Sequence, residues 1–332
     1  MLFGDFPQIP MPFRQLTVRA AVWYNPFLRM MANPRNVAFI LRMKSWLLAL
    51  AAVFVAGTVS AKTTKGVWWW HGEEVVKREV IARRLNFLET QGVGEIYFCV
   101  DLKKFHKETR AFVKAAGVKG MRVALLAGDV SWIRPGSRGF AETLIAYRSY
   151  QRHAAPKERF YALHLDVEPF QDKKLPDERK WQLYADFVLR AAADVHAAGE
   201  KIEWDIPFWL DTFRVAYGER ADAPLLDVVM DNSDGVALMS YRDTAEAMLA
   251  ISEKEIDMAK TRNVRIVLGA ETADTGEGSA VTYFEEGVGK MDAELAKVSA
   301  ALDAAKVPAG AGIAIHHLDS WEKLFKEEGK NE

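Results

Sequence analysis

The sequence predicts a (β/α)8 TIM barrel, an α/β fold in which eight parallel strands alternate with eight helices. After residue 61, short apolar runs of strand character alternate eight times with helical segments. In addition, acidic, histidine and aromatic residues gather where the expected strands end, which is where such barrels carry their sites. An open doubly wound sheet is the alternative, but no Gly-x-Gly-x-x-Gly follows the first strand.

The strands and helices are expected in strict alternation. The strands are predicted at 66–71, 93–101, 121–129, 160–168, 201–209, 235–241, 264–270 and 310–317. The helices are predicted at 74–91, 107–116, 139–153, 178–198, 225–232, 244–261, 284–305 and 320–326. In the helix at 178–198, apolar residues recur every three or four positions, as on a helix with one buried face. No Pro- or Ser-rich linker divides residues 62–332, so we expect one barrel domain there.

The first 61 residues are expected to lie outside the barrel. From Met43 the chain has a basic residue, Lys44, a short apolar run at 46–59 and small residues before position 61, which is typical of a signal peptide at 43–61. The apolar run is shorter than the roughly 20 residues that span a membrane, although an uncleaved anchor remains the alternative. Residues 1–42 precede this start and are interpreted as an extended, non-native N-terminus. The sequence therefore predicts a secreted or periplasmic protein.

Charge and cysteine content argue against other classes of protein. Residues 1–61 hold six basic residues and one acid, so 38 basic and 44 acidic residues remain, a net charge of about −6. A nucleic-acid-binding protein usually carries a basic surface instead. The single cysteine, Cys99, excludes an intrachain disulfide. We expect no nucleic-acid partner, and contact with a membrane only through an uncleaved anchor.

The stretch at 160–168 carries the strongest sign of a site. Successive side chains on a strand point to opposite faces, so His164, Asp166 and Glu168 share one face. Three ionisable groups on one side of a buried strand are costly unless they serve a site. Asp166 and Glu168 lie roughly 7 Å apart along the strand, close enough to share a ligand and to raise each other's pKa.

The other predicted strand ends carry similar side chains. The candidate ligand contacts are Trp69, His71, Asp101, Asp129, His164, Asp205, Trp209, Arg242, His316, Asp319 and Trp321. Indole rings stack on the apolar faces of sugar rings, and carboxylates bind hydroxyl groups and transfer protons. The pattern therefore favours a carbohydrate ligand, with core packing as the alternative for the tryptophans, above all for Trp68 and Trp70.

A metal site is the other interpretation of clustered acids and histidines. His164, Asp166, His316 and His317 could in principle gather around zinc. However, no His-x-His or His-x-x-x-His spacing supports such a site. Adjacent histidines on a strand also point to opposite faces, so at most one of His316 and His317 faces the barrel interior. We expect no metal and no cofactor.

Three strand-end motifs resemble those of the family 18 glycoside hydrolases, the chitinase-like barrels. That family carries Asp-x-x-Asp-x-Asp-x-Glu on its fourth strand, and residues 161–168 keep its last two acids as Asp166 and Glu168. Met239-Ser240-Tyr241 matches the Met-x-Tyr of the sixth strand. Residues 312–319 resemble the Gly-x-x-x-Trp-x-x-Asp of the eighth strand, with a histidine in the place of the tryptophan.

The resemblance implies a role for each matched residue. Glu168 would protonate the glycosidic oxygen, Asp166 would hold a 2-acetamido group that acts as the internal nucleophile, and Tyr241 would bind the acetamido oxygen. His164 replaces an acid of the family pattern and is expected to hold Asp166 as an anion. Glu271 lies outside the pattern, and it is either a second carboxylate for a two-acid mechanism or a buried partner of Arg242. A carbohydrate-binding barrel without catalysis is the alternative function.

Overall fold

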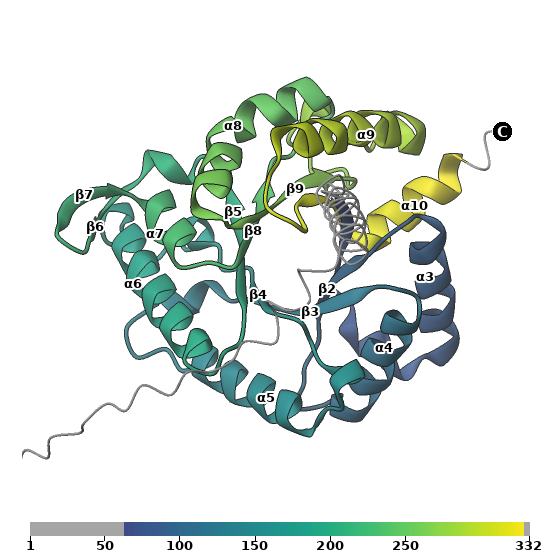
Figure 1. The fold of residues 1–332 in the computed structure, drawn as a ribbon, viewed down its shortest axis with the longest axis horizontal. Helices are drawn as coiled ribbons and strands as arrows, with labels where there is room; N and C mark the ends of the chain where they lie inside the picture. The colour runs from purple at the N-terminus through teal and green to yellow at the C-terminus, as the bar shows by residue number, and fades with distance from the viewer. Residues whose placement is uncertain (1–62, 329–332) are drawn as a thin grey trace, which may run out of the picture. The chain divides into compact units, whose positions relative to one another are not determined.

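The structure is a computed structural model, and it describes residues 63–328, apart from the side chains of Asp177, Glu178 and Glu328. The expected signal peptide at 43–61 and the preceding residues 1–42 lie outside the described residues. Figure 1 shows a closed ring of strands surrounded by helices. The prediction of a single (β/α)8 barrel for this part of the chain is confirmed.

Eight parallel strands form the closed barrel in the order β1-β10-β9-β8-β5-β4-β3-β2. Because β1 pairs with both β2 and β10, the sheet has no free edge, which excludes the open doubly wound alternative. Each predicted strand is confirmed, with ends shifted by a few residues. The strands are β1 (Thr64–Trp69), β2 (Glu95–Cys99), β3 (Arg122–Ala127), β4 (Leu163–Leu165), β5 (Ile202–Pro207), β8 (Gly235–Met239), β9 (Arg265–Glu271) and β10 (Gly312–His316).

A helix follows every barrel strand, as predicted. The helices are α3 (Arg78–Thr90), α4 (His106–Val118), α5 (Gly139–His153), α6 (Asp177–His196), α7 (Leu225–Asp231), α8 (Ala245–Arg262), α9 (Gly287–Ala305) and α10 (Leu318–Glu328). The ends of α8 illustrate how the sequence sets these limits. The Thr244 side chain accepts a hydrogen bond from the Ala247 backbone N–H at its start. Asn263, with a φ of 54°, ends it in the left-handed conformation.

One hairpin was not predicted. Strands β6 (Arg214–Tyr217) and β7 (Arg220–Pro224) pair antiparallel between β5 and α7, and Figure 1 shows them outside the ring of strands. Gly218, with a φ of 58°, allows the tight turn between them. Most side chains of the hairpin are exposed, with Val215 and Ala223 buried, so its sequence lacks a clear apolar alternation.

Each barrel strand presents alternate residues to two different environments. On β1 and β2, Trp69 and Phe98 point outward into the apolar core between the strands and the helices. Their neighbours Trp68 and Tyr97 point into the barrel. Small inward residues on other strands leave room for these large rings, namely Ala124, Ala162, Ala237 and Ala314. The interior is therefore a packed core, as is usual for this fold.

Paired charges fill the barrel near the N-terminal ends of its strands. Arg265 donates to Glu203 at 3.0 Å and also to Glu95. The Tyr161 hydroxyl contacts the same two carboxylates, at 2.9 Å from Glu203. Glu95 and Glu203 are almost completely buried, and such charges are tolerated inside a protein only when they are paired and hydrogen-bonded. This network fills the interior of the barrel at that end.

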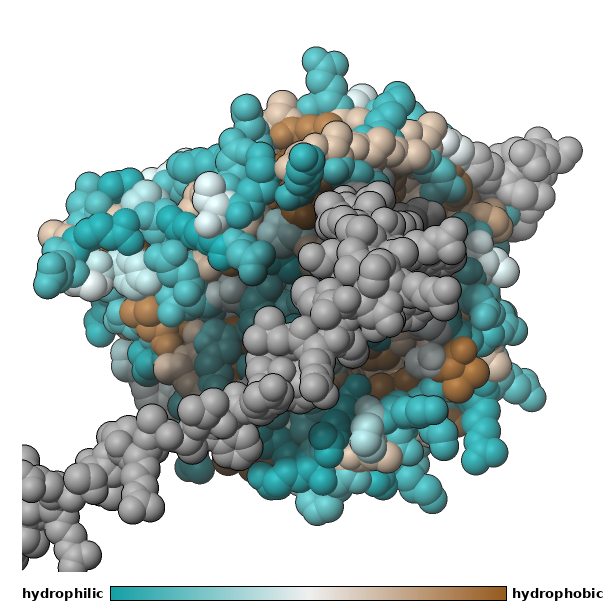
Figure 2. Space-filling model, in the orientation of Figure 1, coloured by the Kyte–Doolittle hydropathy of each residue, from teal (hydrophilic) through white to brown (hydrophobic). Residues whose placement is uncertain are grey.

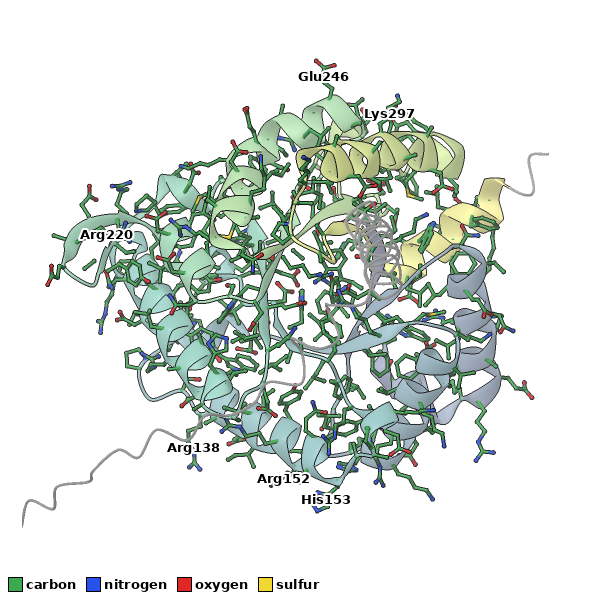
Figure 3. All side chains as sticks on the ribbon, viewed as in Figure 1. Arg138, Arg152, His153, Arg220, Glu246 and Lys297 are labelled. Carbon is green, nitrogen blue, oxygen red and sulfur yellow. The ribbon has the colours of Figure 1, made fainter. Side chains whose placement is uncertain are left out.

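One face of the molecule can be viewed by the hydropathy of its residues. Figure 2 shows polar residues over most of the visible outer surface, interrupted by small apolar areas. Charged side chains on the outer helices, such as Glu246 and Lys297, extend away from the barrel (Figure 3). Within residues 63–328, no helix is long and apolar enough to cross a membrane.

Candidate active site

A cavity of about 360 Å³ lies at the C-terminal ends of the barrel strands. This volume is at the small end of the range for ligand pockets, so the cavity suits a small ligand or one unit of a larger one. Three carboxyl groups, three aromatic rings and a histidine dominate its wall. The lining residues are Trp68, Trp70, Asp166, Glu168, Gln171, Asp205, Met239, Tyr241 and His316.

The end of β4 places two of the acids. The Asp166 backbone N–H donates to the Ala127 carbonyl at 3.0 Å, which continues the pairing with β3 for one residue beyond the strand. Glu168 then precedes Pro169, the first residue of the short helix η4 (Pro169–Gln171). A side chain at Gly128 would lie 1.5 Å from the Asp166 carbonyl oxygen, so only glycine allows this approach of the two strand ends.

The two acids that follow β4 both have raised pKa values. Burial, followed by the negative charge of Asp205, raises the pKa of Glu168 above its ordinary value. Burial also raises the pKa of Asp166 well above its ordinary value, with further contributions from Asp205 and Glu168. The Gln171 side-chain amide donates to Glu168. A carboxyl whose pKa is raised holds its proton to higher pH than an ordinary one, which suits it to donate that proton to a ligand.

Asp205 on β5 is held by two hydrogen-bond donors. The Trp68 indole N–H donates to its Oδ2 at 3.1 Å, and His164 Nε2 lies 2.9 Å from its Oδ1. On its other side, His164 Nδ1 lies 3.3 Å from Glu203 Oε2. Burial alone would lower the pKa of His164, but Asp205 and Glu203 outweigh it and raise the pKa to about 10. The expectation that His164 holds Asp166 as an anion is wrong. The ring bonds to Asp205 instead, and its lowering effect on the pKa of Asp166 is outweighed by burial and by the charges of Asp205 and Glu168.

Tyr241 and His316 form the opposite wall. Their ring centroids are 5.7 Å apart. Burial raises the pKa of Tyr241 well above its ordinary value, with further contributions from Glu271 and Asp205, so the phenol stays a neutral donor. The Trp70 indole N–H donates to His316 Nε2 at 3.4 Å, and His316 Nδ1 lies 2.7 Å from Glu271 Oε2. Of the two adjacent histidines, His316 is the one that lines the cavity.

Glu271 lies just behind the cavity wall. Its Oε1 accepts the backbone N–H groups of Thr272 and Ala273 at 2.8 and 2.7 Å, and its Oε2 contacts His316. It has no ion pair with Arg242, which instead donates to the Tyr241 carbonyl and lies over the Phe208 ring. The suggested pairing with Arg242 is therefore wrong, whereas the role as a second carboxylate stays a prediction. The contact with His316 also places Glu271 where it can orient that ring.

Comparison with known proteins finds similar structures but no matching family. No family model and no curated protein matches this chain. A GH18 chitinase from Pseudoalteromonas aurantia is 10% identical over 80% of this chain and 99% of its own, with a TM-score of 0.47. A chitinase from Chromobacterium violaceum is 12% identical over 80% and 98%, with a TM-score of 0.41. The D-psicose 3-epimerase of Clostridium cellulolyticum is 11% identical over 80% and 92%, with a TM-score of 0.46.

Chitinases are thus among the structures that this chain distantly resembles. The epimerase has a similar score, and at this level of identity the likeness extends to the fold alone. The roles of individual residues are therefore argued from the geometry of this cavity.

Two predicted ligand contacts are core residues instead. Trp69 is fully buried on the outer face of β1, where its ring packs edge-on against Phe98 and Phe112. Trp321 is fully buried on α10 and packs against Phe87. Neither side chain can reach the cavity, so both predictions of ligand contact are wrong. In each case an aromatic residue near a strand end belongs to the packing between strands and helices.

Several other predicted contacts lie near the strand ends but outside the cavity. His71 is exposed, and its Nε2 lies 3.7 Å from Asp319, which Arg84 also binds. The carboxylates of Asp101 and Asp129 accept the backbone N–H groups of Lys103 and Ser131, so both stabilise turns.

Trp209 and Arg242 are likewise placed beyond the cavity wall. The Trp209 ring packs against Phe170 and Trp181, with centroids 5.2 and 6.1 Å apart. Arg242 lies over Phe208, as described above. The structure thus brings Asp166, Glu168, Asp205, Tyr241 and His316 together. His164 lies directly beneath them.

Four cavity residues were not among the predicted contacts. Trp68 on β1 and Trp70 just after its end both line the cavity, whereas the predicted contact is Trp69 between them. Which alternate face of a strand points inward depends on register, and a shift of one residue reverses it. The run Trp68-Trp69-Trp70-His71 shows no alternation of apolar and polar residues. The sequence alone therefore does not indicate which of the three tryptophans point into the barrel. Met239 belongs to the predicted sixth-strand motif, and Gln171 follows the predicted fourth strand closely.

The arrangement of acids and histidines was also compared with that of a metal site. Among residues 63–328, no group of three or more His, Cys, Asp and Glu residues is arranged to hold a metal ion. What the cavity offers chemically is proton transfer and polar binding.

Proposed function

We propose that this protein is a glycoside hydrolase that cleaves glycosidic bonds in a glycan or polysaccharide, with Glu168 as the general acid. The observation that carries the proposal is the placement of Glu168, a carboxyl with a raised pKa, in a cavity that also holds Trp68 and Trp70. Aromatic faces suit sugar rings, and a protonated carboxyl suits the oxygen of the bond to be broken. On the N-terminal pattern alone, we propose that it acts outside the cytoplasm.

In the proposed step, Glu168 transfers its proton to the glycosidic oxygen as the bond to the sugar carbon breaks. The departing sugar leaves as an alcohol, and the remaining ring develops positive charge. Glu271 is poorly placed to attack this ring, because its oxygens already bind two backbone N–H groups and His316. We therefore favour a 2-acetamido group of the substrate as the nucleophile, held by Asp166 and Tyr241, with hydrolysis by water completing the reaction.

Replacing Glu168 by glutamine tests the proposal directly. The change removes the transferable proton while keeping the size and polarity of the side chain. We expect Glu168→Gln to lower the rate of glycan hydrolysis about 10²- to 10⁴-fold, the range typical of a lost general acid. Binding of the same glycan, measured by isothermal titration calorimetry, should change little. Glu246→Gln, on the exposed face of α8 (Figure 3), is the matched control and should keep full activity.

The pH dependence provides a second test of the same role. Glu168 must be protonated to act, so hydrolysis should decline as the pH rises through its pKa, which lies above the ordinary glutamic acid value. If the wild-type protein binds glycans but hydrolyses none across a broad panel, catalysis is excluded and a carbohydrate-binding barrel is the remaining function. Equal activity of wild type and Glu168→Gln would reject the role of Glu168.

A further inference from the structure

Trp70, His316 and Glu271 form a chain of hydrogen bonds across the ends of three neighbouring strands. The Trp70 indole N–H, just after the end of β1, donates to His316 Nε2 at 3.4 Å. On the other edge of the imidazole ring, Nδ1 lies 2.7 Å from Glu271 Oε2. Strand β10 pairs with β1 on one side and with β9 on the other, where His316 is the partner of Glu271. The register of the barrel thus brings the three side chains together.

The donors and acceptors of this chain fit in one direction. An indole nitrogen can only donate, so His316 Nε2 is the acceptor in this contact and carries no proton. The proton of the imidazole is then on Nδ1, which donates to Glu271 Oε2. Glu271 Oε1 accepts the backbone N–H groups of Thr272 and Ala273 at 2.8 and 2.7 Å. The contacts therefore select the Nδ1–H tautomer of His316 and fix the far end of the chain to the backbone.

Three aromatic rings pack around the imidazole. The ring centroids of Trp68 and Tyr241 each lie 5.7 Å from that of His316, and the Trp70 centroid lies 6.1 Å away at an interplanar angle of 75°. Glu271 is 3% exposed, whereas Trp70 and His316 are only partly buried and line the cavity. The buried carboxyl is therefore connected, through His316, to an aromatic ring that can meet a ligand.

We propose that Glu271 and His316 are positioning residues for glycan binding, whose hydrogen bonds hold the Trp70 indole in the cavity wall where a sugar ring can stack on it. This inference rests on the proposed function, which supplies the sugar. An aromatic ring that is already held in its bound orientation loses less conformational freedom when the ligand arrives. Glu271 acts through His316 and not on the reacting atoms, so its loss should weaken binding more than it slows the chemical step.

Glu271→Gln tests this chain in the full protein. The new side-chain carbonyl can accept the two backbone N–H groups, which turns the NH₂ group toward His316 Nδ1. Nδ1 must then accept, the proton moves to Nε2, and two donors face each other at Trp70. We expect the dissociation constant of a glycan, measured by calorimetric titration, to rise about 2- to 10-fold, as for one lost hydrogen bond, and KM to change more than kcat. Glu246→Gln, on the exposed face of α8, is the matched control.

The tautomer of His316 can be measured without any ligand by NMR of the full chain labelled with ¹⁵N-histidine. At pH 7.5, the wild type should show the Nδ1–H tautomer at His316, and Glu271→Gln should show the Nε2–H tautomer. His316→Gln assigns these signals among the seven histidines. A wild-type His316 with its proton on Nε2, or with both nitrogens protonated, would overturn the inference.

A double-mutant cycle with Trp70→Phe separates the positioning of Trp70 from a general structural role of Glu271. Phenylalanine keeps an aromatic ring but has no N–H group, so the chain has no indole to hold. In the Trp70→Phe background, Glu271→Gln should therefore change the glycan dissociation constant less than about twofold, because the two residues act through one set of contacts. Equal losses of affinity in both backgrounds would show that Glu271 acts by another route and would overturn the inference.

The outcomes separate this inference from the proposed function. If the tautomers behave as expected but the wild type binds no glycan, the hydrogen-bond chain stands and the proposed function fails. If hydrolysis depends on Glu168 but Glu271→Gln changes neither the tautomer nor the affinity, the function stands and the inference fails. A loss of kcat in Glu271→Gln as large as that in Glu168→Gln would also overturn the inference, because it would assign Glu271 a direct catalytic role.

Discussion

Glu271 shows how the contacts of one carboxylate define its role. Its Oε1 accepts two backbone N–H groups and its Oε2 contacts His316, so these contacts hold both oxygens behind the cavity wall. A glutamine at this position can accept the same N–H groups and still contact the histidine ring. We expect Glu271→Gln to reduce the rate of hydrolysis less than about tenfold, as measured by steady-state kinetics on the glycan that the wild type cleaves. A loss as large as that of Glu168→Gln would instead identify Glu271 as the second catalytic carboxylate.

At the same scale, the sequence identified the acids but not their partners. The alternation along residues 163–168 correctly placed His164, Asp166 and Glu168 on one face, because that pattern depends only on strand geometry. It wrongly paired His164 with Asp166, because the true partner, Asp205, lies on the next strand at a distance of 2.9 Å. Such a pairing depends on the register between β4 and β5, in which His164 lies beside Glu203. One strand read alone contains no information on that register.

At the scale of elements, the end of β1 places two adjacent tryptophans in different surroundings. Trp69 is fully buried between the strand and the helices, whereas Trp70 lines the cavity. We expect Trp69→Ala to lower the free energy of unfolding by about 3–5 kcal/mol, the usual cost of removing a large core side chain, without changing glycan affinity once folded. Trp70→Ala should cost less stability and weaken glycan binding. Urea unfolding and calorimetric titration of both variants check this, and weaker binding by folded Trp69→Ala would contradict the assignment.

Periodicity was sufficient to predict the barrel elements, but not the hairpin. The eight strands and eight helices each bury an apolar face, which leaves a clear repeat in the sequence. Strands β6 and β7 are built largely from exposed and charged residues around Gly218, and their pairing is stabilised by contacts such as that of Arg214 with Asp222. A hairpin of this kind lacks the alternation of apolar residues that identifies a half-buried strand.

At the scale of the whole molecule, the closed barrel buries charges whose ionisation must respond to pH. His164 has its pKa raised to about 10, so its contribution to stability is complete below about pH 6.5 and is lost as the pH rises toward 10. The acids with raised pKa values act in the same direction, because they bind protons in the folded state that the unfolded chain has already released. We therefore expect the free energy of unfolding to fall from pH 5 to pH 9.

Glu255 on α8 allows one part of this pH dependence to be isolated far from the cavity. Its side chain is 1% exposed, its Oε1 has no hydrogen-bond partner among residues 63–328, and burial followed by the charge of Asp211 raises its pKa to about 7. Its contribution to stability is therefore present below its ordinary pKa of 4.5 and lost as the pH rises through 7. Above pH 7 a buried, incompletely bonded anion destabilises the fold.

We expect Glu255→Gln to be more stable than the wild type at pH 8 and nearly equal to it at pH 5. The difference at pH 8 should be at most about 3.5 kcal/mol, since the pKa rises from 4.5 to about 7 and each pKa unit corresponds to about 1.4 kcal/mol. Urea unfolding of both proteins at the two pH values measures it. Glu253→Gln, an exposed change on the same helix, should leave the pH dependence unaltered. An equal difference between Glu255→Gln and wild type at both pH values would show that packing, rather than ionisation of this carboxyl, sets the effect.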